Sequence, residues 1–134
     1  MRCEGWEKKL ADVIKQRRFA TFVWGQHDCC LFAADCALAI TGTDWAADFR
    51  GQYDSAAGAA KQIAKRGGFE AMITGLLGDP LASVTTAQRG DVVMVDQDGH
   101  PALAVCCGAT VVAAGISGLV FRPLTDGLLA WRVC

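Results

Sequence analysis

The chain has 134 residues, of which 52% are hydrophobic and 20% are charged, and its formal net charge is −1. These proportions predict a single globular domain over residues 1–134 and exclude a disordered chain. No cluster of basic residues exceeds a pair, so the charge pattern predicts binding neither to nucleic acid nor to an anionic membrane surface. No apolar run reaches the roughly 18–20 residues that a membrane span needs.

The first part of the chain carries two helical patterns. Apolar residues recur at helical spacing over residues 4–17, which predicts an amphipathic helix. Gly25 then interrupts the chain, and Asp28 is a suitable N-cap for a second helix over residues 28–41, which Gly42 ends. This second helix is apolar on nearly all sides, so we expect it to be buried at the centre of the fold.

Two shorter helices are predicted after a loop. Residues 43–54 have the composition of a loop, and Ser55 can cap a helix over residues 56–66. A short helix is expected over residues 69–77, because a glycine and a proline follow it closely. The helical part of the chain therefore covers about residues 4–80.

The pattern changes to short strands from about residue 90. Turn residues separate runs that are rich in β-branched and small apolar side chains, and a turn is predicted over residues 96–99. The predicted strands are residues 91–95, 102–107, 110–114, 119–122 and 128–133. Helices followed by an antiparallel meander predict an α+β fold, with N-terminal helices packed on a small antiparallel sheet over about residues 90–134.

Seven cysteines are many for a chain of this length, and their number is odd. The N-terminus lacks the apolar segment of a signal peptide, so we expect a chain that is cytoplasmic when synthesised and carries no disulfide scaffold. Most of the thiols are then small buried side chains. No Cys-x-x-Cys pair is present, which argues against a metal site, and nothing in the chain indicates a cofactor.

The segment W-G-Q-H-D-C at residues 24–29 leads directly into the apolar helix. It places Cys29 in the first turn of that helix, where free backbone N–H groups and partial positive charge lower the pKa of a thiol. Trp24, His27 and Asp28 lie beside this thiol and are the candidate binding residues. Each has a structural alternative: Trp24 as a core residue, His27 as a loop residue, Asp28 as a helix cap and Cys29 as a small buried side chain.

Two segments together resemble a known superfamily. F-V-W-G at residues 22–25 with Asp28-Cys29 opening an apolar helix, and R-G-D-V-V at residues 89–93 opening a strand, resemble the NlpC/P60 superfamily. These are papain-like cysteine peptidases that cut the peptide stems of bacterial peptidoglycan. The compact Trp-Gly-x-x-Asp-Cys form and A-W-R-V at residues 130–133 are similar to a branch of the superfamily seen in phages and prophages.

The resemblance implies a papain-like fold and a cysteine hydrolase. Cys29 would be the nucleophile, His100 its base, and the backbone N–H of Cys29 a donor to the oxyanion. The implied partners are cell-wall peptides or phage structural proteins. The protein would remain in the cytoplasm after synthesis or become part of a virion.

Several residues depart from the superfamily pattern and leave a second interpretation open. The position of the family histidine falls on Ala102, and His100 lies two residues upstream. Phe22 replaces a tyrosine that can donate to the oxyanion, and Cys30 replaces the serine that usually follows the nucleophile. The alternative is a member that keeps the fold without the chemistry and serves in phage tail assembly or binds a protein or peptide.

Overall fold

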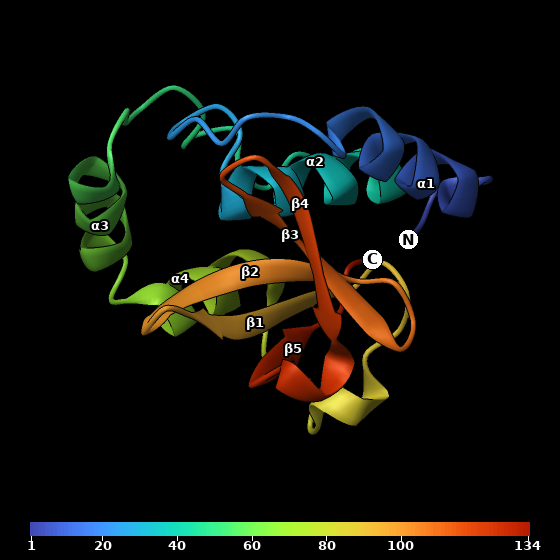
Figure 1. The fold of residues 1–134 in the computed structure, drawn as a ribbon. Helices are drawn as coiled ribbons and strands as arrows, with labels where there is room; N and C mark the ends of the chain where they lie inside the picture. Colours follow the sequence, from blue (N-terminus) through green and yellow to red (C-terminus); the bar gives the residue numbers. More distant parts are fainter.

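A computed structural model describes residues 1–134 and shows an α+β fold, which confirms the fold class predicted from the sequence. Four helices come first along the chain and five strands follow them (Figure 1). Each of these elements ends within two residues of its predicted boundary. Their bounds are α1 Trp6–Arg17, α2 Cys29–Thr41, α3 Ala56–Lys65, α4 Phe69–Leu77, β1 Val92–Gln97, β2 His100–Cys106, β3 Thr110–Gly115, β4 Gly118–Pro123 and β5 Leu129–Trp131.

Two short 3-10 helices, Val84–Thr86 and Leu124–Asp126, were not predicted, because a single turn has no periodicity to detect. None of the helices is both long and apolar enough to cross a membrane.

The five strands form one antiparallel sheet in the order β4-β3-β2-β1-β5. β1 and β2 pair along their whole length, from Val92↔Val105 to Gln97↔His100. Asp98 and Gly99 form the connecting turn, with φ angles of 54° and 85°, as a two-residue hairpin requires. The turn is therefore shorter than the predicted four residues, because Asp-Gly closes the hairpin by itself.

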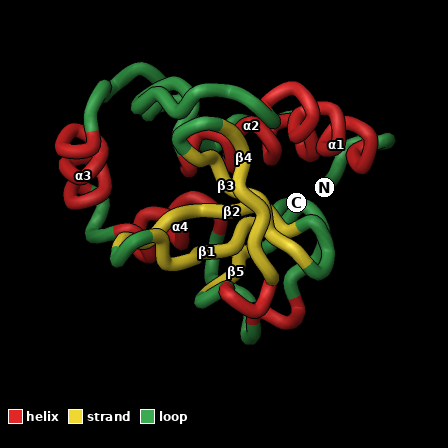
Figure 2. Tube along the Cα trace, in the orientation of Figure 1, coloured by secondary structure: helices red, strands yellow, loops and turns green.

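The pairing between β2 and β3 is short. It covers only Val105↔Val112 and Cys106↔Val111, although both strands continue beyond these residues. β3 and β4 then bend away from β2 toward α2, which Figures 1 and 2 show from the same side. The edge of β2 before Val105 is thus left without a partner strand on that side.

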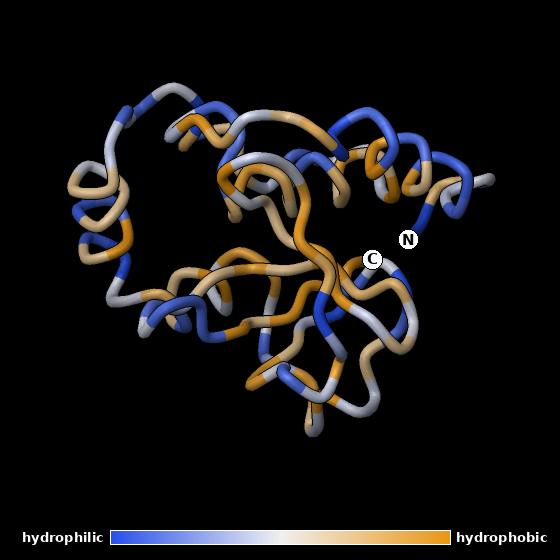
Figure 3. Tube along the Cα trace, in the orientation of Figure 1, coloured by the Kyte–Doolittle hydropathy of each residue, from blue (hydrophilic) through white to orange (hydrophobic).

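The sheet has a core on each of its faces. Helix α2 is buried over most of its surface and packs on β2 and β3, in a cluster that also contains Leu10 of α1 and Trp131 of β5. A smaller cluster of valines and alanines covers the opposite face. Figure 3 shows the strands as mainly hydrophobic, whereas α1 alternates hydrophilic and hydrophobic residues. The central position predicted for the second helix is confirmed.

Helix α3 stands apart from the rest of the fold (Figure 1). Ser55 caps it by accepting a hydrogen bond from the Gly58 N–H, as the sequence predicts. Ala59 is its only buried residue. A long loop joins it to α2 (Figure 2), and Ile63 on its inner side packs against the large core cluster.

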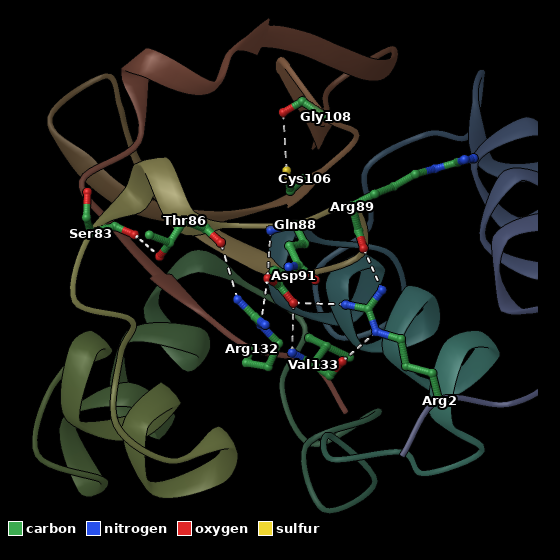
Figure 4. A network of polar contacts seen from close by, with 10 residues as sticks. All are labelled: Arg2, Ser83, Thr86, Gln88, Arg89, Asp91, Cys106, Gly108, Arg132 and Val133. Carbon is green, nitrogen blue, oxygen red and sulfur yellow. Dashed lines mark hydrogen bonds and ion pairs between the residues drawn. The ribbon is translucent and has the colours of Figure 1, made fainter.

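A buried carboxylate joins the two ends of the chain (Figure 4). Asp91 is fully buried, and its Oδ1 accepts hydrogen bonds from the Arg2 Nη2 at 2.9 Å and from the Val133 N–H at 3.0 Å. Its Oδ2 accepts from the Gln88 N–H at 2.8 Å and lies 3.1 Å from the Arg132 Nε. Asp91, the last residue of the R-G-D segment, is therefore a structural ion-pair centre.

Candidate functional site

A cavity of about 830 Å³ lies beside the N-terminus of α2. Its walls come from the turn before α2, the loop that leads to α3, α3 itself, and the tips of the β1–β2 and β3–β4 hairpins. Nineteen of its 27 lining residues are hydrophobic. Four of the predicted site residues line this cavity: Trp24, Asp28, Cys29 and His100. The fifth, His27, does not line it.

A tight turn positions the start of α2. The Val23 N–H donates to the His27 carbonyl at 2.9 Å, and the His27 N–H donates back at 2.8 Å. Gly25 lies inside this turn with a φ of 82°, and a Cβ on it would stand 1.9 Å from the Tyr53 carbonyl oxygen. A glycine is required here both by the backbone conformation and by the close approach of the loop before α3.

Asp28 is the N-cap of α2, as the sequence predicts, and its carboxylate accepts three hydrogen bonds. Its Oδ1 accepts a hydrogen bond from the Leu31 N–H at 3.0 Å. Its Oδ2 accepts from the Gly25 N–H at 3.1 Å and from the Tyr53 hydroxyl at 2.6 Å. Burial and this bond to Asp28 raise the pKa of Tyr53. Sequence reasoning missed the role of Tyr53, whose only signal was being the single tyrosine of the chain.

Cys29 lies in the first turn of α2 and opens onto the cavity. Its Sγ is 4.0 Å from the Sγ of Cys30, close enough for an S–H to be donated between them. The Cys30 thiol is the main cause of a lowered Cys29 pKa, and the backbone N–H of Leu103 adds to the effect, while burial opposes both. The same contact and burial raise the pKa of Cys30 well above its usual value, so Cys29 ionises first.

The Leu103 N–H reaches Cys29 because of the sheet geometry described above. Cys106 directs its backbone groups toward the β1 side, where it bonds to Gly90 and Asp91. Backbone groups alternate along a strand, so those of Leu103 point to the other side. There β3 has already left β2, and Cys29 occupies the vacated edge.

Ala102 and His100 both line the cavity, but only Ala102 belongs to the apolar cluster against which Cys29 packs. Ala102 is buried in the cluster of small apolar residues against which Cys29 packs. His100 is the first residue of β2, is exposed, and lies on the cavity lining beside the hairpin turn. The two side chains share one face of the strand and are separated by about 6.6 Å along it. No histidine contributes to the lowered pKa of Cys29.

His27 is buried and does not line the cavity. Its ring packs edge-on against Phe32 at 5.9 Å, and neither ring nitrogen has a hydrogen-bond partner. Burial lowers its pKa, and the nearby Arg17 acts in the same direction. Trp24 lies on the cavity wall and makes an edge contact with Phe22 at 4.8 Å. The structure therefore places Trp24 and Asp28 on the same cavity as the thiol and leaves His27 outside the cavity lining.

The remaining cysteines are separate from this site. All seven thiols are free, and burial raises the pKa of Cys36, Cys106 and Cys107. No three histidine, cysteine or acidic side chains come together in a group that could hold a metal ion. Cys29 and Cys30 both line the cavity beside α2, and of the two Cys29 has the lowered pKa.

One comparison with known proteins gives a match over almost the whole chain. A family model described as Domain of unknown function (DUF6950) matches residues 1–133. No curated protein and no solved structure matches the chain.

Proposed function

The chain belongs to the DUF6950 family, and we propose that this member is a phage- or prophage-derived cysteine hydrolase with a papain-like fold of the NlpC/P60 type. Its substrates in this proposal are the stem peptides of peptidoglycan. The observation that carries the proposal is the Cys29 thiol, whose pKa is lowered at a helix N-terminus that opens onto a large cavity. Helices that carry the cysteine, followed by an antiparallel sheet, also fit the element order of the superfamily.

The chemistry is an acyl transfer in two steps. The Cys29 thiolate attacks the amide carbonyl carbon, and the backbone N–H of Cys29 stabilises the oxyanion. The tetrahedral intermediate collapses to a thioester, and the leaving amine takes its proton from the His100 imidazolium. A water molecule, activated by the neutral His100, then hydrolyses the thioester and regenerates the thiolate.

His100 reaches this role from the β1–β2 hairpin. It lines the same cavity as Cys29, and it lies two residues upstream of the position at which the superfamily pattern places the histidine. Catalytic hydrogen bonds are often long before substrate binds and shorten in the complex. In this proposal the bound peptide fills the space between the two side chains, with Trp24 as the wall of the peptide groove. The protein is made in the cytoplasm and reaches the cell wall with the phage particle or at lysis.

A second candidate is favoured by one specific observation. No histidine is hydrogen-bonded to Cys29 or contributes to its lowered pKa, so the free protein has no imidazole base in place at the thiol. A member of this kind binds a cell-wall peptide or a phage structural protein in the cavity without cleaving it. It serves in tail assembly or as a binding module.

Hydrolysis of purified stem peptides separates the two candidates. We expect the wild type to release new amino groups, Cys29→Ala to release none, and His100→Gln to be slower by about 10²–10⁴-fold. The decisive variant is Ala102→His, which places an imidazole on the cavity lining at the position that the superfamily pattern gives to the histidine. If the wild type is inactive and Ala102→His cleaves the peptide, the binding module is correct and the hydrolase proposal is wrong.

Alkylation of Cys29 tests the activated thiol independently of any substrate. Cys30→Ala removes the S–H that lowers the Cys29 pKa, so the rate of reaction with iodoacetamide should rise only at higher pH than in the wild type. The matched control is Cys36→Ala, on the same helix and buried away from the cavity lining. The modified cysteine is identified by peptide mapping at each pH. Identical profiles for Cys30→Ala and the wild type would remove the basis of the proposal.

A further inference from the structure

The cavity beside Cys29 is apolar inside and polar at one end. Its inner wall is formed by hydrophobic side chains of the loop before α3, of α3 and of α4, including Trp45, Phe49, Ala59, Ile63 and Met72. Gln97, Asp98 and His100 lie at the exposed tip of the β1–β2 hairpin and supply the polar end. A ligand that matches this distribution has a long apolar part and one polar end.

In the free protein the Cys30 thiol is the only side chain hydrogen-bonded to the Cys29 sulfur, so no acid is already in place there to protonate a leaving amine. The Tyr53 hydroxyl is donated to Asp28, and His100 lies at the exposed hairpin tip. The pKa of Cys30 is raised well above its usual value, so its proton is held tightly. An amide leaves as an amine and needs a proton, whereas a thioester leaves as a thiolate of pKa about 8.5 and needs none.

We propose that the cavity binds an apolar acyl chain presented as a thioester and that Cys29 takes up the acyl group by thiol–thioester exchange. The Cys29 thiolate forms a new C–S bond to the acyl carbon. The original C–S bond breaks, and its electron pair leaves with the departing thiolate, so no redox partner and no proton are required. The inference rests on the proposed function only in taking Cys29 as the nucleophile, and the exchange involves no step through His100.

The size and lining of the cavity give this inference a measurable signature. A volume of about 830 Å³ falls in the range of about 300–1,000 Å³ that encloses small-molecule ligands. Each methylene group moved from water into such a lining improves binding by about fourfold. The second-order rate of acylation should therefore rise with chain length until the cavity is full.

The test incubates the full chain with N-acetylcysteamine thioesters of acetyl, butanoyl, octanoyl and dodecanoyl groups. Intact mass and peptide mapping locate the acyl group, and chromatography measures the released N-acetylcysteamine, so turnover is detected even if the acyl-enzyme is hydrolysed. We expect modification at Cys29, about fourfold faster for each added methylene over the shorter chains. Cys29→Ala should lose this reaction.

A pair of variants on α3 tests the cavity itself. Ala59 is buried and lines the cavity, so Ala59→Phe should reduce the rate with dodecanoyl more than the rate with acetyl. Ala57 lies on the exposed side of the same helix and outside the lining, and Ala57→Phe is the matched control. Iodoacetamide labelling of Cys29 in both variants shows that the thiol and the fold are retained. The chain-length series of the wild type remains decisive if Ala59→Phe does not fold.

Three results would overturn the inference: equal rates for acetyl and dodecanoyl, acylation of the exposed Cys134 in place of Cys29, or no acylation at all. Alkylation of Cys29 without acylation would refute the inference and leave the hydrolase proposal standing. Chain-length-dependent acylation without peptide cleavage would refute the hydrolase proposal and support the inference.

Discussion

Two buried aspartates, Asp28 and Asp91, organise two different regions of this molecule. Both side chains are almost completely buried, with exposed fractions of 1% and 0%. Both come from segments whose sequence resembles one superfamily. Asp91 has two arginines and two backbone N–H groups around it, whereas Asp28 has two N–H groups, one phenol and no cation.

The difference separates a structural region from a candidate functional one. The two arginines pair with Asp91, and they thereby connect residues near both ends of the chain to the start of β1. The Asp28 carboxylate is stabilised only by hydrogen bonds. Its region opens onto the cavity, with Cys29 beside it. A buried carboxylate next to a motif is therefore no sign of chemistry by itself, and its partners decide which role it has.

The largest effect is expected from breaking the ion pairs of Asp91. Asp91→Ala leaves the part-buried Arg2 guanidinium and the N–H groups of Gln88 and Val133 without their acceptor, and we expect the free energy of unfolding to fall by about 3–5 kcal/mol. Denaturant titration followed by fluorescence measures this change. The matched control is Asp126→Ala, which removes an exposed Arg122 ion pair and should cost less than about 1 kcal/mol. Equal losses in the two variants would contradict the structural role of the Asp91 region.

The two glycines that precede the aspartates should respond differently to alanine. Gly25 and Gly90 both have positive φ angles, of 82° and 95°, so both variants carry about 1–2 kcal/mol of backbone strain. A Cβ at Gly25 also meets the Tyr53 carbonyl oxygen, whereas at Gly90 it meets the movable ends of Ile40 and Arg2. We therefore expect Gly25→Ala to lower the free energy of unfolding by about 2–4 kcal/mol and Gly90→Ala to lower it only by the backbone strain. Thermal unfolding measures both changes. The reverse order would show that the turn before Asp28 is the more adaptable of the two.

The smallest effect concerns His27, which lies outside the cavity lining. Burial lowers its pKa in the folded protein below the unfolded value of about 6.5. Its contribution to stability is thus complete above pH 6.5 and is lost as the pH falls from there through the folded pKa. His27→Phe should lose less stability than the wild type between pH 7 and pH 5, as measured by urea titration. His100→Gln is the control for loss of an exposed histidine, and a pH dependence unchanged by His27→Phe would place the titration elsewhere.

Local signals in the sequence predicted most of the elements and one part of the site. Asp28 was identified as an N-cap and Gly42 as the helix end, and both have these roles in α2. The same reasoning could not place Tyr53, because its bond to Asp28 spans 25 positions in the chain. The R-G-D segment was detected by its resemblance to a superfamily, but only the fold shows that its aspartate is fully enclosed.

The sequence by itself determined where helices and strands form and where a cysteine begins a helix. Those features depend on periodicity, caps and turns, which act over a few residues. The tertiary structure decided what surrounds that cysteine: β3 leaves β2, the Leu103 N–H is free to bond to the sulfur, Ala102 joins the apolar cluster against which Cys29 packs, and His27 lies outside the cavity lining. These relations depend on how distant elements pack against one another, and no local pattern carries that information.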